Sequence, residues 1–481
     1  MKTWILVLMA FLTQALHAQQ AGSVTLSTSD TKLQETFDWA KRTALGYAHD
    51  GKDPVGYWYE AALPGREAFC MRDVAHQSMG AEILGLSPHN FNMMYKFAAN
   101  ISDAKDWCSY WEINRHDKPA PVDYSDDKDF WYNLTASPDV IQACYRLYEW
   151  TGNREYLSHP VLRNFYEKSL TVYLDRWKLN PDEVMNRPRY LNLEDPPRAG
   201  ARFRNARGIP SYVEAAGGFI VGVDLIAALY AGCQAYGEML SLRGEKDKAV
   251  QFVRKAEAYK KLVDEKWWNE QKGQFETFVT PGGVFRDNVQ TINGLTYVIW
   301  FQATSDSARI KGVLDLLPEL PANVENRSHY PYLLYRGRYT EDAYHILVSL
   351  KDMERSKYPE VSFGVMEGIV AGMMGLRPSA TKGVIQTLPQ LTAGTEWAEV
   401  RGVPVLGTTV GVKHEAAGRS TFTNSGTGAV QWQASFYGDF QKIRVDKEET
   451  KAESGVDAMG NRYAFVKVEV QPGRTVSASA R

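Results

Sequence analysis

The chain has 481 residues, of which 44% are hydrophobic and 12% aromatic, enough to bury one large core or two domains of unequal size. A formal net charge of −2 gives no support for binding to nucleic acid or to an anionic membrane surface. The 13 Trp and 26 Tyr exceed what a core needs and suit contacts with carbohydrate, although many will be core residues.

The first 18 residues have the pattern of a secretory signal peptide. Lys2 gives a basic start, Trp4 to Leu12 is an apolar run too short to cross a bilayer, and Ala18 offers a small residue for cleavage. No other run is long and apolar enough for a membrane helix. We therefore expect an exported, soluble chain, secreted or periplasmic, with no membrane contact and no obligate protein partner.

A loop rich in aromatic and charged residues runs into a helix between Tyr57 and Leu86. Pro64 and Gly65 break the chain, and a helical pattern begins near Met71. A carboxylate in the first turn of a helix gains from the helix dipole, and an arginine can fork onto hydroxyl or carboxylate oxygens. The stretch therefore predicts a sugar pocket with five substrate-binding residues: Trp58, Arg66, Arg72, Asp73 and Gln77.

About a dozen helices follow one another in pairs joined by loops. Phe219 to Leu242 is nearly all apolar and should be buried on several sides, whereas Lys246 to Trp267 is amphipathic. This alternation predicts a mostly α chain with a closed double ring of helices and polar loops at one mouth. In the long loop from Asp103 to Leu134, Trp131 and Tyr132 are expected to stack on sugar faces.

After Pro378 the pattern changes to short strand-like segments separated by Gly, Asn and Ser. We predict a small antiparallel β-sandwich over residues 381–481, following a helical catalytic domain over residues 22–380 and the signal peptide over residues 1–18.

The four cysteines match no zinc pattern, and no His-Asn set marks any of them as a nucleophile. Export permits disulfides, and three pairings are open. For Cys70, which lies in the stretch from Tyr57 to Leu86, we expect a buried free thiol rather than a catalytic one. The chain offers no His-x-x-x-His ligand set, and the acidic run from Asp123 to Asp129 is interpreted as a solvated loop, so we predict neither a metal nor a cofactor; a structural calcium stays open.

Several passages together resemble the six-hairpin glycosidases, such as glycoside hydrolase families 63, 37 and 78. Pro64 to Gln77 looks like the loop-to-helix entry of family 63, and Gly217 to Gly232 with Lys255 to Glu276 looks like a helix and hairpin of that group. His329 to Leu347 and Tyr358 to Ala380 are similar to the end of a family 78 barrel and its passage into a sandwich. The resemblance implies an (α/α)6 barrel and inverting glycoside hydrolysis.

Inverting hydrolysis needs a protonated carboxyl at the leaving oxygen and a second carboxylate that activates water. Glu214 is the predicted general acid, because it precedes a buried helix among apolar residues and stands where the resemblance places the acid. Glu67 is the alternative, since family 78 carries its acid in a similar loop. Glu360, at a loop–helix junction, is the predicted base, and Glu367 is its alternative or a substrate-binding residue. Two more residues are expected at the mouth: His329 and Tyr330.

The sequence thus predicts an exported inverting glycoside hydrolase acting on an oligosaccharide or polysaccharide-derived glycan, with carbohydrate as its partner. One alternative is a polysaccharide lyase, in which the basic loop from Arg187 to Arg207 binds uronates. Another is a non-catalytic glycan-binding protein. The sugar, its anomer, the linkage and the choice between exo and endo action stay open.

Overall fold

The structure is a computed structural model that describes residues 21–188, 200–203, 206–214, 218–286, 293–416, 418–457 and 459–480. The predicted signal peptide and part of the loop from Arg187 to Arg207 lie outside these ranges. Within them, no helix has the length and apolar character needed to cross a membrane.

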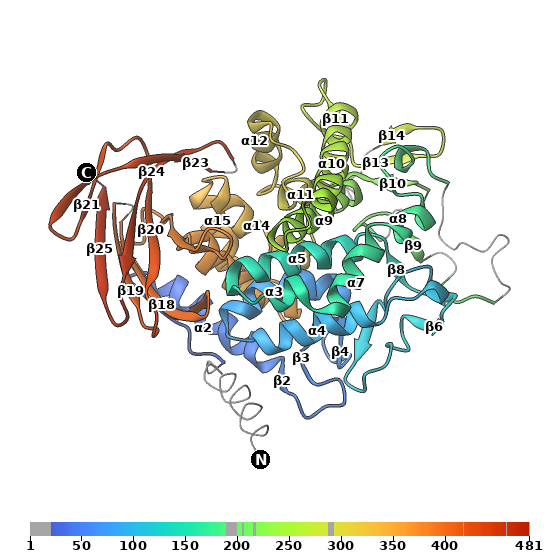
Figure 1. The fold of residues 1–481 in the computed structure, drawn as a ribbon, viewed down its shortest axis with the longest axis horizontal. Coiled ribbons are helices and arrows are strands. Elements are labelled where there is room, and N and C mark those ends of the chain that lie inside the picture. Colours follow the sequence, from blue (N-terminus) through green and yellow to red (C-terminus); the bar gives the residue numbers. More distant parts are fainter. Residues whose placement is uncertain are drawn as a thin grey trace, which may run out of the picture.

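Helices make up most of the chain up to residue 373, and a β-rich region follows (Figure 1). The longer helices are α2 (Thr31–Gly46), α3 (Met71–Ile83), α4 (Ser87–Ala99), α5 (Ala136–Thr151), α7 (Pro160–Ser169), α9 (Val223–Leu242), α10 (Lys246–Leu262), α11 (Asn293–Trp300), α12 (Ser307–Leu316), α14 (Tyr330–Arg336), α15 (Thr340–Ser349) and α16 (Pro359–Glu367). Shorter ones are α6 (Glu155–Ser158), α8 (Val172–Trp177) and α13 (Val324–Arg327). Two π-helical turns extend α10 and α16: η3 (Val263–Trp267) and η5 (Gly368–Met373).

Six helices, which we call the inner helices, contact one another in the order α3, α5, α9, α11, α14 and α16, and α16 contacts α3 again. A second helix packs against each of them: α4, α7, α10, α12, α15 and α2, in the same order. Helix α9 is buried along most of its length, whereas α10 buries only one stripe, as the apolar patterns predict. The closed toroid of six hairpins stays a prediction.

Gly80 allows α3 and α16 to lie unusually close. A Cβ at Gly80 would stand 2.2 Å from the carbonyl oxygen of Phe363, so only glycine fits. His76 lies about one turn before Gly80, and Glu360 about one turn before Phe363. The close packing of the two helices therefore also brings these two side chains together.

Two larger sheets form the β-rich region. One has the order β1-β17-β18-β19-β25-β21-β22, and the other has the order β15-β16-β20-β24-β23. Phe422 on β19 stacks on Trp432 on β20 with ring centroids 5.2 Å apart, so the two sheets face each other as a sandwich. The strands are β1 (Thr25–Thr28), β15 (Arg377–Ser379), β16 (Val384–Thr387), β17 (Trp397–Val405), β18 (Thr408–Glu415), β19 (Arg419–Asn424), β20 (Val430–Tyr437), β21 (Lys442–Val445), β22 (Glu448–Lys451), β23 (Glu453–Val456), β24 (Arg462–Val470) and β25 (Thr475–Ala480).

The β-rich region differs from the predicted one in two respects. Strand β1, near the other end of the chain, joins its larger sheet by pairing with β17, with Thr25 opposite Arg401. Strand β16 pairs with β20 in parallel, so the sandwich is not purely antiparallel. The reason is topological: after β16 the chain passes through the other sheet before it returns at β20, and such a crossover allows parallel neighbours.

Short strands cover the ends of the helices. They are β2 (Ala48–Asp50), β3 (Tyr57–Tyr59), β4 (Ala68–Cys70), β5 (Glu112–Asn114), β6 (Tyr124–Asp126), β7 (Asp129–Phe130), β8 (Tyr132–Asn133), β9 (Arg207–Ile209), β10 (Val221–Gly222), β11 (Trp268–Asn269), β12 (Gln274–Phe275), β13 (Phe278–Thr280) and β14 (Val284–Arg286). All four cysteines are free thiols and are buried: Cys70, Cys108, Cys144 and Cys233.

Candidate functional site

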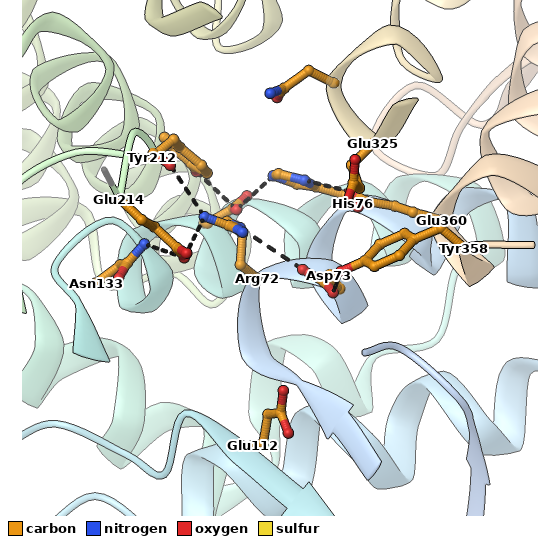
Figure 2. Close-up of polar contacts among 12 residues, drawn as sticks. Arg72, Asp73, His76, Glu112, Asn133, Tyr212, Glu214, Glu325, Tyr358 and Glu360 are labelled. Carbon is orange, nitrogen blue, oxygen red and sulfur yellow. Dashed lines mark hydrogen bonds and ion pairs between the residues drawn. The ribbon is translucent and has the colours of Figure 1, made fainter. Parts of the chain in front are cut away.

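A cavity of about 600 Å³ lies at the N-terminal ends of the inner helices. We call it the carboxylate cavity, because three glutamates line it (Figure 2). Its walls come from the start of α3, the loop before α9, α11, α13 and the start of α16. The side chains used below are Arg72, His76, Tyr212, Glu214, Tyr297, Glu325, Tyr358 and Glu360.

Acidic residues recur in the first turn of the helices that meet here. The first turn of α3, α5, α9, α13 and α16 each holds one: Asp73, Asp139, Asp224, Glu325 and Glu360. A helix N-terminus carries a partial positive charge and unpaired N–H groups, which stabilise a nearby carboxylate. The ring of helix starts is therefore suited to gathering several acids at one end of the helical part.

Glu360 lies at the floor of the cavity, with 4% of its side chain exposed. Its Oε1 is 2.9 Å from Nδ1 of His76 and 2.9 Å from Nε2 of His329. Burial alone would raise the pKa of Glu360, but the hydrogen bonds and charges of the two histidines outweigh it and lower the pKa to about 2. Glu360 is therefore an anion at neutral pH.

His76 links Glu360 to a second acid on α5. Its Nε2 is 2.9 Å from Oδ2 of Asp139, which also accepts a hydrogen bond of 2.8 Å from the hydroxyl of Tyr212. Burial alone would lower the pKa of His76, but Asp139 and Glu360 raise it to about 9. At neutral pH the imidazolium therefore donates from Nδ1 to Glu360 and forms an ion pair with Asp139 through Nε2, and Glu360 is held in one orientation.

Glu214 stands at the mouth of the cavity, with 36% of its side chain exposed. Its Oε1 accepts hydrogen bonds from Arg72, at 3.2 Å, and from Nδ2 of Asn133 on β8, at 3.1 Å (Figure 2). Arg72 also donates to the carbonyl of Tyr212 at 3.3 Å. Arg72 thus connects the acid at the mouth to the loop that carries it.

Asp224 fixes the loop that carries Tyr212 and Glu214. It lies in the first turn of α9, and its Oδ2 accepts hydrogen bonds from Oγ of Ser211, at 2.6 Å, and from the amide of Tyr212, at 3.0 Å. The Tyr212 ring stacks on Tyr297 of α11, with centroids 3.7 Å apart. The buried Asp in an apolar helix is thus an anchor for the loop.

Glu325 is a third acid at the cavity, and sequence reasoning missed it. It forms an ion pair with Arg355, while its Oε2 is buried and has no hydrogen-bond partner within the described ranges. Burial raises the pKa of Glu325, and the charge of Glu360 adds to the effect. Of the acids that line the cavity, Glu325 has the environment that favours a bound proton.

Asp73, predicted to grip sugar hydroxyls, lies behind the cavity wall and is only 2% exposed. The hydroxyl of Tyr358 donates to its Oδ2 at 2.7 Å, and Nε of Arg72 is 3.7 Å from its Oδ1. Burial and the charge of Glu360 raise the pKa of Asp73 to about 7, although Arg72 and Tyr358 act in the opposite direction. Asp73 therefore positions Arg72 and Tyr358 and does not itself face the cavity.

The structure brings Arg72, Glu214 and Glu360 together at the cavity. His329, expected at the mouth, is 2% exposed and lies behind Glu360 instead of lining the cavity, and the other predicted residues lie elsewhere. Four of them are buried in the interior: Trp58, Gln77, Tyr132 and Tyr330. Trp58, for example, stacks on His49 and donates to Asp53, so it has no face left for a sugar. Trp131 packs on a small apolar cluster of Phe203, Ala206 and Ile209.

The two alternative catalytic residues also lie outside the carboxylate cavity. Glu67, with a left-handed φ of +50°, pairs with Arg115 beside a separate hollow. Arg66 lines that hollow too and pairs with Glu112, which Figure 2 shows well away from the other acids. Glu367 lies about two turns into α16 and pairs with Arg146.

Three side chains at the floor have the donor types of a metal site. His76, His329 and Glu360 offer ligand atoms that all lie within 4.8 Å of one another. However, both histidines approach the same carboxylate oxygen at hydrogen-bond distance, and a doubly protonated His76 has no lone pair to give. The geometry therefore fits a hydrogen-bonded carboxylate better than a set of metal ligands.

Sequence reasoning missed several residues of the site, namely His76, Asn133, Asp139, Tyr297 and Glu325. His76 was visible, since it falls one helical turn after Arg72 and so faces the same side of α3. Asp139 follows Pro138 at the start of α5, a position that favours acids. The short helix that carries Glu325 gives no periodic signal.

No family model matches the chain, and no curated protein matches it. Among solved structures, it is similar to the GH78 family rhamnosidase of Bacillus sp. GL1, with a TM-score of 0.58 and 13% identity over 83% of this chain and 40% of that one. The α-L-rhamnosidase from Dictyoglumus thermophilum gives a TM-score of 0.60 and 11% identity over 96% of this chain and 50% of that one. A putative kojibiose phosphorylase from human microbiome gives a TM-score of 0.52 and 9% identity over 94% and 63%.

The chain thus spans half or less of the length of the two rhamnosidases. At these identities the likeness shows the fold. The protein has a fold of the (α/α)6 glycosidase type, as the resemblance of its motifs implied, and the similarity assigns it to no single family.

Proposed function

We propose that this chain is an exported inverting glycoside hydrolase that cleaves a glycosidic bond of an oligosaccharide or a polysaccharide-derived glycan. The proposal includes a closed (α/α)6 toroid, supported by the order in which the inner helices contact one another. The observation that carries the proposal is that Glu214 and Glu360 reach one cavity from distant parts of the chain. Two carboxyl groups facing one cavity are the minimum that this chemistry requires.

Glu360 is the proposed general base. Its anionic form is maintained by His76 and His329, both of which contact Oε1. Within the described residues Oε2 has no hydrogen-bond partner, so it is the oxygen that can accept a proton from the attacking water. The two histidines fix the direction of that oxygen, and such positioning lowers the barrier to proton transfer.

Glu214 is the proposed general acid. It lies at the mouth, where a leaving group would face solvent, and Arg72 and Asn133 hold its Oε1. That arrangement leaves Oε2 of Glu214 available to protonate the leaving group. In an inverting enzyme the acid and the base stand about 6.5 to 9.5 Å apart, with the sugar and the water between them. A cavity of about 600 Å³ has room for both.

Glu325 is the rival for the role of the acid. It lines the same cavity, and its raised pKa favours the protonated form that a general acid needs. Its pairing with Arg355 opposes that form. The contrast between Glu214 and Glu325 can be decided by the kinetics of matched variants.

The similar structures indicate which sugars to test first. Two of them are rhamnosidases, so α-L-rhamnosides of nitrophenol head a panel of aryl glycosides and oligosaccharides. Proton NMR of the first-formed sugar anomer then gives the stereochemistry. We expect an inverted anomer; a retained one would exclude the base role of Glu360, and no turnover on a broad panel would remove the proposal.

A lyase is the second candidate, because Arg72 lies in the cavity beside the hydroxyl-bearing rings of Tyr212 and Tyr358. A lyase uses a base of this kind and a cation next to a uronate. It would release a product with the ultraviolet absorbance of an unsaturated uronide. A glycan-binding protein without activity would instead retain its affinity for glycans in a variant that lacks both Glu214 and Glu360.

A further inference from the structure

A second cavity lies at the C-terminal ends of the inner helices, where the helical part meets the β-rich region. Its volume is about 440 Å³, and its walls come from α5, α9, the end of α11, α14 and β15. We call it the arginine cavity, because three guanidinium groups line it: Arg146, Arg336 and Arg377.

Arg336 is a buried cation whose charge is not neutralised. It is the last residue of α14 and is 8% exposed. In the part of the chain that the structure describes, it has neither an ion-pair partner nor a side-chain hydrogen bond, and its guanidinium lies 5.6 Å from the ring centre of Tyr332. Burial lowers the pKa of Arg336, and the charges of Arg377 and Arg146 lower it further. Its nitrogen atoms have no hydrogen-bond partner in that part of the chain and are not fully buried, so the guanidinium faces the cavity, where a charge without a counter-charge is costly.

Arg377 is only partly buried, but it also lacks an ion-pair partner among the described residues, whereas Arg146 has one. The Nη2 of Arg377 is buried without a hydrogen-bond partner among the described residues, and no carboxylate in those ranges lies within ion-pair distance of Arg377. Arg146 is paired with Glu367 and lies 5.0 Å from the ring centre of Trp300. Two of the three guanidinium groups thus lack a counter-charge.

The acids at the cavity are engaged by other groups. Glu149 accepts hydrogen bonds from Ser379, at 2.6 Å, and from Thr381. Asp457 accepts one of 2.9 Å from the hydroxyl of Tyr437 and attracts Arg336 only from beyond ion-pair distance. The helix C-termini that face this end offer partial negative charge, but that contribution is smaller than the cost of burying the cation.

The remaining lining is typical of a saccharide site. Tyr332 is partly exposed and presents an aromatic ring, whereas Trp300 is 4% exposed and lies under Arg146; the amides of Gln142 and Gln234 can pair with hydroxyl groups. The cavity is far larger than an inorganic anion and is within the usual range for small organic ligands. Guanidinium forks match the two oxygens of a carboxylate.

We propose that the arginine cavity binds an acidic saccharide of one or two residues, with its carboxylate held by Arg336 and Arg377 and its ring near Tyr332. This site goes beyond the proposed hydrolysis, because it lies at the opposite ends of the inner helices from Glu360. No bond forms or breaks there, so the site is one of binding alone.

Calorimetry and thermal unfolding of the full chain test the proposal, with glucuronate, glucose and inorganic phosphate as probes at low ionic strength. We expect glucuronate to bind and to raise the unfolding temperature, because a ligand of the native state stabilises it. Glucose, which lacks the charge, should bind much more weakly. Arg336→Gln and Arg377→Gln should each weaken glucuronate binding by at least about tenfold, the loss of one charge-assisted contact.

Two matched variants locate the effect. Arg338→Gln removes an exposed guanidinium two residues beyond Arg336, outside the cavity lining, and should leave binding unchanged. Arg72→Gln removes the cation of the carboxylate cavity and should leave it unchanged too. In the absence of ligand, Arg336→Gln should not lower the unfolding temperature, since it removes an uncompensated charge.

Several outcomes would overturn the proposal. Glucose or phosphate binding as tightly as glucuronate would remove the acidic saccharide as the ligand. Loss of binding in Arg72→Gln alone would place the anion in the carboxylate cavity. Unchanged binding in both Arg336→Gln and Arg377→Gln, or no binding to the native chain, would show that the guanidinium groups only support the packing.

Discussion

The two ends of the inner helices carry opposite kinds of charged side chains. At the N-terminal ends are Glu214, Glu325 and Glu360, and at the C-terminal ends are the three guanidinium groups of the arginine cavity. Helix dipoles favour this sorting, because each kind of charge faces the helix end of opposite sign. The dipoles alone would give two symmetric ends, yet the two ends differ in how completely their charges are paired.

At the carboxylate end, the deepest acid is fully compensated. Two histidines hold Glu360, and Asp139 in turn holds one of the histidines. At the arginine end, Arg336 and Arg377 have no such partners within the described ranges. At the carboxylate end the charges are paired before any ligand binds, whereas at the arginine end two cations still lack a counter-charge. Four predictions test this contrast, from the largest expected effect to the smallest.

The first prediction concerns Glu360→Gln. Loss of the base should lower kcat by about 10² to 10⁴-fold, whatever the leaving group, because water activation is still missing. Steady-state rates on aryl glycosides measure it. Glu82→Gln is the matched control: it also neutralises a buried glutamate of the helical part, one that Asn90 and Ser87 hold away from the cavity, and it should retain a near-normal rate. A near-normal rate for Glu360→Gln would show that Glu360 is not the base, and the contrast between the two ends would no longer hold.

The second prediction separates the two candidate acids. Glu214→Gln should cost about 10² to 10⁴-fold on substrates with poor leaving groups and much less on activated aryl glycosides, which need little protonation. Glu325→Gln should change the rate by a similar factor for every leaving group. The readout is the slope of log kcat/KM against the pKa of the leaving group. If the steep slope appears in Glu325→Gln instead, the acid is Glu325.

The third prediction uses the pH dependence of stability. The pKa of His76 rises from 6.5 to about 9 in the folded chain. Its contribution to the free energy of unfolding is therefore full below pH 6.5 and is lost as the pH rises to about 9. The pKa of Glu360 falls from 4.5 to about 2, so its contribution is full above pH 4.5 and is lost as the pH falls toward 2. The free energy of unfolding of the native chain should therefore fall between pH 6.5 and about 9, and in His76→Gln this fall should be absent.

Urea unfolding at constant ionic strength between pH 6 and pH 10 measures the effect, which should be on the order of a few kcal/mol. His345→Gln, which changes an exposed histidine, should leave the pH profile as it is in the native chain. An unchanged alkaline limb in His76→Gln would mean that the imidazole at the cavity floor is neutral in the folded state.

The fourth prediction expects no effect. Chelation with EDTA followed by dialysis should leave the rate unchanged, because Oε1 of Glu360 is already hydrogen-bonded to both His76 and His329. Loss of activity that zinc or calcium restores would instead make these three side chains ligands, and Glu360 would no longer be a free base.

Sequence reasoning predicted two of the acids that line the carboxylate cavity but few of its other side chains. Glu214 and Glu360 were predicted to face one mouth because each lies at a loop–helix junction. These junctions can be recognised from Pro359 and from the apolar run of α9. The fold type followed from the alternation of buried and amphipathic helices together with the motifs that resemble glycosidases. Both signals are local in sequence.

The rest depended on contacts between distant segments. Trp58 and Tyr132 were expected on sugar faces, but an excess of aromatic residues does not say which of them fill the core. Glu325 gave no signal, because its role arises only where α13 meets the start of α16. Arg336 looked like an ordinary residue at a helix end, and only the packed structure shows that its charge lacks a partner.

The pairing of β1 with β17 has a consequence for how the chain reaches its native state. β1 occupies the outer position of the seven-stranded sheet, and it comes from the opposite end of the sequence to its partner. A chain that folds as it is made must keep residues 25–28 unpaired until β17 has emerged. Conversely, a shortened protein without these residues would expose the backbone of β17 as an open edge, a template for aggregation. Recombinant forms should therefore begin before Thr25.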